Sequence, residues 1–99
     1  MVSRSLHFTA LAEQDLTEIA LYIAADNPAR ALSFTAELRA HCKSIADNPE
    51  IYRLREEYGR DVRVAVHGRY LIFYAERQAG VVVIERILHG ARHLDWLDL

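Results

Sequence analysis

Apolar residues recur with a helical period in the first part of the chain. The positions at i, i+4, i+7, i+8 and i+11 are Ala12, Leu16, Ile19, Ala20 and Ile23. This spacing is typical of the buried face of an amphipathic helix. Thr9 can cap its amino end, and the acids of the first turns suit the positive end of the helix dipole. Residues 4–8 alternate weakly before it and predict a short strand.

A second helix is predicted to begin at the Asp26-Asn27-Pro28 break and to run to about Asp47. Either residue before the proline can cap it, and a proline suits the first helical position, where its missing N–H costs nothing. The apolar stripe consists of Ala31, Phe34, Leu38 and Ile45, with Cys42 beside it. Because the connection is short, the two helices should form an antiparallel hairpin.

From Asp61 onward the period changes to two, which predicts strands. In residues 62–67 three valines alternate with other residues as in a half-exposed strand, and Gly68 can take positive φ in a tight turn. Residues 70–74 are apolar on both faces, as in a central strand, and residues 81–88 predict a third strand.

The remaining segments show no clean period. Residues 50–60 are expected to form an irregular, charge-rich loop, and residues 77–80 a turn. The tail from Ala91 can form a short helix that carries Leu94, Trp96 and Leu97.

The element order predicts an α+β fold. We expect an N-terminal strand, an antiparallel helical hairpin, a three-stranded antiparallel meander and a short C-terminal segment. A chain of 99 residues has room for a single domain, residues 1–99. The sequence does not place the first strand in the sheet.

Composition narrows the classes of function. Cys42 is the only cysteine, so no internal disulfide can form, and a reducing cytoplasm fits best. No apolar run approaches the ~20 residues of a membrane span, and the amino terminus does not have the pattern of a signal peptide. We therefore expect no membrane partner. No P-loop, GxSxG or GxGxxG motif is present, so no cofactor is expected.

Charge is distributed unevenly. The net charge of −2 argues against direct nucleic acid binding, because domains that bind phosphates are usually basic. Residues 1–50 hold four basic residues against seven acids, a balance of −3, whereas residues 53–92 hold eight arginines against five acids, a balance of +3. The two halves of the chain therefore differ in chemistry.

Arg86 is a candidate for either a structural or a functional role. Alternation along a regular strand would place Ile84, Arg86 and Leu88 on one face, so Arg86 would lie among apolar neighbours. A partly buried arginine needs an anionic partner, and an acid such as Asp61 or Glu57 is expected to supply it. A structural ion pair is the favoured interpretation.

His89 is a candidate general acid or base at a strand end. Cleavage of RNA would require cations on the phosphate and a second proton-transfer group such as Glu85 or Tyr74. The possible cations are Arg63, Arg69, Arg86 and Arg92. A histidine that merely caps the strand end is the favoured alternative. His93 follows at a metal-ligand spacing, but Gly90 disfavours a helix there, and no metal site is expected.

Several segments together resemble a known family. These are "LTEIALYIAADNPARALSF", the stretch from Asn48-Pro49 to Arg55-x-Glu57, "HGRYLIFY" and "VVVIERILHGARH". In order and spacing they resemble the ParE branch of the RelE/ParE type II toxin superfamily over nearly the whole chain. The resemblance implies a toxin that binds DNA gyrase without catalysis and is neutralised by a ParD-like antitoxin, which folds on binding.

The RelE branch, whose members cleave messenger RNA on the ribosome, is the alternative. Such nucleases tend to carry lysine near the second strand, whereas the one lysine here, Lys43, belongs to a helix. In their favour, His89 stands about where some of them place a catalytic histidine, with Arg69 or Arg86 as its partner. Tyr52 and His93 depart from the family pattern. A toxin-like regulator without activity also stays open.

The sequence thus predicts a binding site and no catalytic residues. The residues expected to contact the target are Arg63, Arg69, Arg86, His89 and Arg92, with Trp96 as an apolar anchor. The antitoxin is expected to cover the acidic helical hairpin and an exposed sheet edge.

Overall fold

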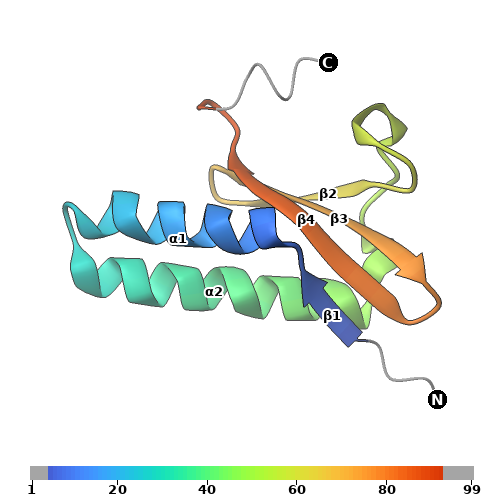
Figure 1. The fold of residues 1–99 in the computed structure, drawn as a ribbon, viewed down its shortest axis with the longest axis horizontal. Helices are drawn as coiled ribbons and strands as arrows, with labels where there is room; N and C mark the ends of the chain where they lie inside the picture. The colour runs from blue at the N-terminus through green and yellow to red at the C-terminus, as the bar shows by residue number, and fades with distance from the viewer. Residues whose placement is uncertain (1–4, 93–99) are drawn as a thin grey trace.

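The computed structural model describes residues 5–92, which form a sheet with a helical hairpin packed on one face (Figure 1). The helices and strands are β1 Ser5–Phe8, α1 Ala10–Ala24, α2 Pro28–Asp47, β2 Arg63–His67, β3 Tyr70–Gln78 and β4 Val81–His89. Two short 3-10 turns, Pro49–Ile51 and Glu56–Tyr58, lie between α2 and β2. The predicted α+β order is confirmed.

The strand order in the sheet is β1-β4-β3-β2. β1 runs parallel to β4, with Ser5 opposite Val81 and Phe8 opposite Ile84. The other two pairings are antiparallel, as the meander predicts. Gly68, the first residue of the two-residue β2–β3 loop, has a φ of 62°, which a glycine adopts without strain. The first strand, which the sequence left unplaced, therefore lies at the sheet edge beside the last.

Both helices begin at the predicted caps. The Thr9 hydroxyl accepts a hydrogen bond from the backbone N–H of Ala12 at 3.0 Å and donates one to the Glu85 carbonyl at 2.8 Å. The Asn27 side chain accepts from the backbone N–H of Arg30 at 3.1 Å. Thr9 thus starts α1 and also ties it to β4. No helix among residues 5–92 is long and apolar enough to cross a membrane.

The main core lies between the helical hairpin and the sheet. The helices contribute buried side chains that the stripes predicted, among them Ala12, Leu16, Ile19, Leu38, Cys42 and Ile45. Phe34 is partly buried at the margin of this core. From the sheet, Tyr74, Ile72 and Ile84 complete it. The amphipathic pattern therefore placed the helix faces correctly.

β2 turns a different face to the helices than its valines suggest. Ala65 is buried in the main core, whereas Val66 is 61% exposed. Val62 and Val64 belong to a second apolar cluster, together with Phe73 and Leu88. Since β2 is an edge strand, Val66 has a neighbouring strand on one side only, where it lies opposite Leu71.

A bulge in β4 breaks the strand alternation at Glu85. Phe73 of β3 lies opposite Arg86, but the next residue, Tyr74, lies opposite Ile84, so Glu85 is an extra residue. One extra residue moves every later side chain to the other face. The prediction that Ile84, Arg86 and Leu88 share one face is therefore wrong for Ile84, which lies in the main core while Leu88 lies in the second cluster.

Cys42 should be unreactive in the folded protein. Its side chain is fully buried, and burial raises the pKa of the thiol to about 12. Because the thiolate is the nucleophile, we expect no labelling by a thiol reagent at neutral pH until the protein unfolds. Mass spectrometry of samples treated with and without urea checks this. Rapid labelling of the native chain would contradict it.

Tyr74 should contribute a buried hydrogen bond. Its hydroxyl donates to the Pro49 carbonyl at 2.7 Å, and burial raises the pKa of the phenol to about 12. Tyr74→Phe leaves that carbonyl unsatisfied and should cost ~1 kcal/mol in urea unfolding. The exposed Tyr22 offers a matched control, since Tyr22→Phe should leave the unfolding midpoint unchanged. Equal midpoints for all three chains would contradict the assignment.

Candidate target-binding site

The carboxylate of Asp15, on α1, lies at the edge of β4. β1 ends opposite Ile84, and beyond that point Asp15 accepts a hydrogen bond from the backbone N–H of Ile87 at 2.9 Å. The same carboxylate accepts from Nε and Nη2 of Arg86, both at 2.9 Å. This bonding raises the pKa of Arg86. The edge of β4 is therefore paired with β1 as far as Ile84 and bonded by Asp15 of α1 at Ile87.

The ion pair of Arg86 corrects one prediction. Arg86 is paired, as expected, but the expected partners Asp61 and Glu57 are wrong. Glu57 pairs with Arg55 at 2.8 Å, and Asp61 lies 3.6 Å from Arg60. The true partner, Asp15, is only 5% exposed and stands 71 positions earlier in the sequence.

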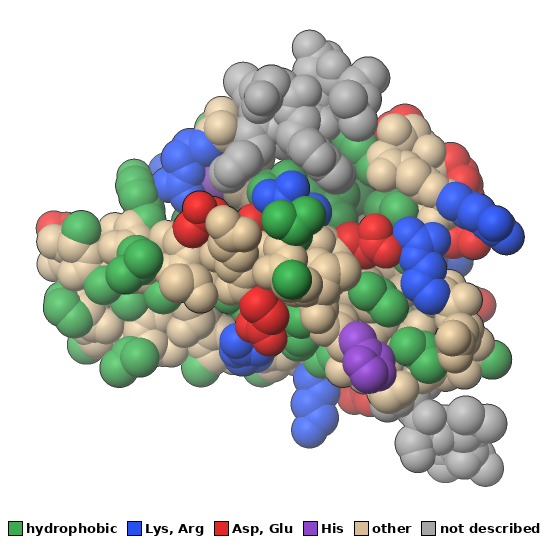
Figure 2. Space-filling view, viewed as in Figure 1, with side chains coloured by type: hydrophobic (Ala, Val, Ile, Leu, Met, Phe, Trp, Pro, Cys, Tyr) green, Lys and Arg blue, Asp and Glu red, His purple; other side chains and the backbone are tan. Residues whose placement is uncertain are grey.

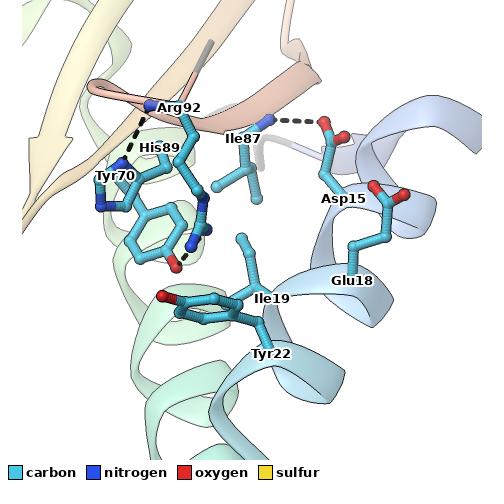
Figure 3. Close-up of a pocket in the computed structure, with 8 residues that line it drawn as sticks. All are labelled: Asp15, Glu18, Ile19, Tyr22, Tyr70, Ile87, His89 and Arg92. Carbon is cyan, nitrogen blue, oxygen red and sulfur yellow. Dashed lines mark hydrogen bonds between the residues drawn. The ribbon is translucent and has the colours of Figure 1, made fainter.

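A pocket of about 380 Å³ opens beside this ion pair. Figure 3 shows it between α1 and the ends of β3 and β4. One wall comes from α1 and the other from the sheet, and the lining residues are Asp15, Glu18, Ile19, Tyr22, Tyr70, Ile87, His89 and Arg92. The pocket thus combines acids on the helix with a cation and aromatic rings near the carboxyl end of β4.

His89 occupies the rim in a defined orientation. Its Nδ1 accepts from the backbone N–H groups of Ala91 at 3.2 Å and Arg92 at 3.3 Å. The ring meets Tyr70 edge-on, with centroids 5.1 Å apart. A neutral imidazole whose Nδ1 is an acceptor carries its hydrogen on Nε2. In this arrangement the ring caps the end of β4 and its Nδ1 lone pair is already engaged, which suits binding better than proton abstraction.

Arg92 is held by two aromatic residues. Its Nη2 donates to the Tyr70 hydroxyl at 3.0 Å, and its guanidinium carbon lies 4.1 Å from the centroid of the Tyr22 ring (Figure 3). Sequence reasoning named Arg92 but missed both tyrosines. Tyr70 belongs to the predicted central strand and is buried in the main core, as its apolar neighbours indicate, whereas Tyr22 lies outside the apolar stripe of α1.

The other predicted contact residues are distributed around the sheet. Arg69 is exposed in the β2–β3 loop, and its carbonyl accepts from the Gly90 N–H at 3.0 Å, so this loop lies beside the end of β4. Arg63 instead donates to the Tyr52 carbonyl and helps to line a different pocket, with Glu50 and Glu76. Trp96, Leu94, Leu97 and the short helix predicted there lie outside the described residues.

The arginine excess of the second half does not form a basic patch. Within residues 5–92, four of its eight arginines form ion pairs with acids, namely Arg55, Arg60, Arg77 and Arg86. On the face shown in Figure 2, basic and acidic side chains are interspersed. Within residues 5–92 no group of three or more potential ligands could hold a metal ion. The geometry supports recognition by a few positioned side chains.

A histidine pair joins α2 to β2 away from the pocket. Nδ1 of His41 lies 2.9 Å from Nδ1 of His67, and its Nε2 lies 3.2 Å from the Tyr52 hydroxyl. Tyr52, a departure from the family pattern, is thus part of a hydrogen-bonded chain. Since one of the two Nδ1 atoms must be the acceptor, the contact is lost if both rings are charged.

This histidine pair predicts a loss of stability in acid. Burial, and secondarily the charge of His67, lowers the pKa of His41. Below the unfolded value of about 6.5 the unfolded chain binds more protons, so stability should fall as pH drops from about 7 through the folded pKa. His41→Gln should flatten this slope in urea unfolding, while His7→Gln should retain it. Parallel profiles for wild type and His41→Gln would count against the pair.

Known proteins share both this architecture and this sequence pattern. A solved chain described as "Chromosomal ParDE TA system from P. aeruginosa" superposes with a TM-score of 0.76 over 87% of this chain and 95% of that chain. The two are 19% identical, a level at which the likeness establishes the fold alone. No match was found among curated proteins.

The chain therefore shares the α+β fold of that structure. The family model "ParE toxin of type II toxin-antitoxin system, parDE" matches residues 6–94. Because the match covers most of the sequence, the chain belongs to the ParE toxin family.

Proposed function

We propose that the chain is the toxin of a ParDE-type pair and that it inhibits DNA gyrase by binding, without catalysis of its own. The family match supports the toxin class. The observation that most favours binding over RNA cleavage is the ion pair of Arg86. Its Nε and Nη2 are both engaged by the buried Asp15, which removes a cation that the nuclease alternative would direct at phosphate.

The proposed contact surface is the pocket rim at the end of β4. His89 and Arg92 stand there, and the loop carrying Arg69 lies next to it. We include Trp96 from the sequence, and we keep Arg63 as a weaker candidate because it bonds to the Tyr52 carbonyl. Arginine is enriched where a few residues dominate an interface, since its guanidinium binds carboxylates at two points.

The proposed antitoxin surface is the helical hairpin together with the free edge of β2. β2 pairs with β3 on one side, and its outer side meets Leu54 at Arg63. Within residues 5–92 no strand pairs with the outer edge at 64–67, which an added strand could therefore use. The hairpin adds exposed Leu21 and Leu32. Deleting the carboxy-terminal segment of the antitoxin should abolish tight binding.

The decisive experiment compares labelled thymidine with labelled methionine incorporation after the chain is induced in bacteria without antitoxin. An early halt in DNA synthesis, with translation continuing, is expected for gyrase inhibition. If translation stopped first and His89→Ala abolished RNA cleavage, the nuclease would replace this proposal. If neither process changed, the chain would be an inactive toxin or have another target.

A further inference from the structure

Tyr22 contacts Arg92 although its own side chain is largely exposed. Tyr22 is 64% exposed, so its ring adds little to the core. Yet the Arg92 guanidinium carbon lies 4.1 Å from the ring centroid, well within the ~6 Å range of a cation–π interaction. The ring covers the cation from the helix side, while Tyr70 accepts its hydrogen bond from the sheet side (Figure 3).

This arrangement restricts a side chain that would otherwise be mobile. A free arginine loses up to ~2 kcal/mol of rotamer entropy when a partner immobilises it. A ring on one side and a hydroxyl on another remove part of that freedom before binding, which favours the complex through preorganisation. The ring contact is made at the guanidinium carbon and, unlike a hydrogen bond, uses none of the N–H donors, of which Nη2 serves the Tyr70 hydroxyl.

We propose that Tyr22 is a positioning residue that holds Arg92 for contact with the target. The inference rests on the proposed function, since it assigns Arg92 to the gyrase contact. Tyr22 acts through Arg92, and its own hydroxyl plays no part. The aromatic ring makes the contact with Arg92, so phenylalanine at position 22 should preserve the positioning and leucine should not.

The test measures dissociation constants for intact gyrase with wild type, Tyr22→Phe, Tyr22→Leu, Arg92→Ala and the Tyr22→Leu/Arg92→Ala double variant. Loss of an exposed cation–π contact corresponds to about 2- to 5-fold weaker binding for Tyr22→Leu. Tyr22→Phe should bind as wild type does. In the double variant, Tyr22→Leu should add nothing to the loss caused by Arg92→Ala, because coupled residues are not additive.

A second readout is independent of the target. In NMR spectra of the free protein, ring currents from Tyr22 should shift the Arg92 side-chain protons in wild type and Tyr22→Phe, and the shift should collapse in Tyr22→Leu. Identical Arg92 signals in all three chains would overturn the inference whatever the chain binds. Arg92→Ala weakening gyrase binding while Tyr22→Leu does not would overturn it and leave the proposed function standing. Wild type failing to bind gyrase at all would overturn both the proposed function and the assigned role of Tyr22 in it.

Discussion

Replacing Asp15 with alanine is expected to destabilise the fold by about 3 kcal/mol, because it leaves Arg86 without its partner in a partly buried position. It also leaves the Ile87 N–H without its acceptor at the edge of β4. The Arg86 side chain is 24% exposed, so water offsets part of the loss and the value lies at the low end of the range for buried pairs. Urea unfolding followed by circular dichroism measures the change.

One further variant separates the charge of Asp15 from its hydrogen bond to Ile87, and a second serves as a control for the loss of an acid. Asp15→Asn keeps an oxygen that can accept from Ile87 and should cost less than Asp15→Ala. Glu18→Ala removes an acid from the same helix and the same pocket, and as a surface change it should stay within about 0.5 kcal/mol. Equal losses for Asp15→Ala and Glu18→Ala would show that the ion pair does not stabilise the fold.

The sequence predicted those parts of the fold that depend on local chemistry. Thr9 and Asn27 predict the starts of the helices because a cap side chain bonds to a backbone N–H only three residues further along the chain. Gly68 marks the hairpin because the turn requires positive φ at that residue. The helix stripes follow from a period that each helix carries on its own. Each of these signals is complete within a few positions.

Other parts depend on residues that are distant in sequence. The pairing of β1 with β4 joins residues that differ in position by 76, and no pattern in four residues specifies it. Nothing in the sequence of β4, four apolar residues followed by Glu85-Arg86 and two more apolar residues, predicts the bulge at Glu85, although the bulge decides which way Arg86 points. Asp15 lies near the start of a helix, where acids are common because of the helix dipole. The local sequence therefore offers no reason to pair it with Arg86.

The candidate site also combines residues that the local sequence indicates with one that only a distant contact reveals. Arg92 and His89 could be proposed because they cluster with Arg86 at a strand end. Tyr22 could not, since an exposed aromatic residue on a helix is common and its neighbour in space comes from the other end of the chain. A systematic search for tyrosines outside apolar stripes would have flagged it without naming the arginine it contacts.

If the chain inhibits gyrase as proposed, replacing Arg92 with alanine should weaken that inhibition more than any other single change at the rim. The Arg92 guanidinium is already held by Tyr70 and Tyr22, and an arginine that acts as a binding hot spot is worth ~2 kcal/mol or more, about 30-fold in affinity. Inhibition of DNA supercoiling by the purified chain measures the effect. Growth arrest at matched expression gives a second readout in cells.

Arg60 supplies the matched control, because its side chain is 90% exposed and it lies in the loop before β2. Arg60→Ala removes the same charge but should leave inhibition within about twofold, since long-range charge effects are screened beyond ~8 Å at physiological salt. If both variants lose activity equally, the net charge of the chain matters and the pocket rim does not. If Arg92→Ala alone loses it, while its unfolding midpoint stays near that of wild type, recognition depends on a single arginine that the fold has oriented before the target arrives.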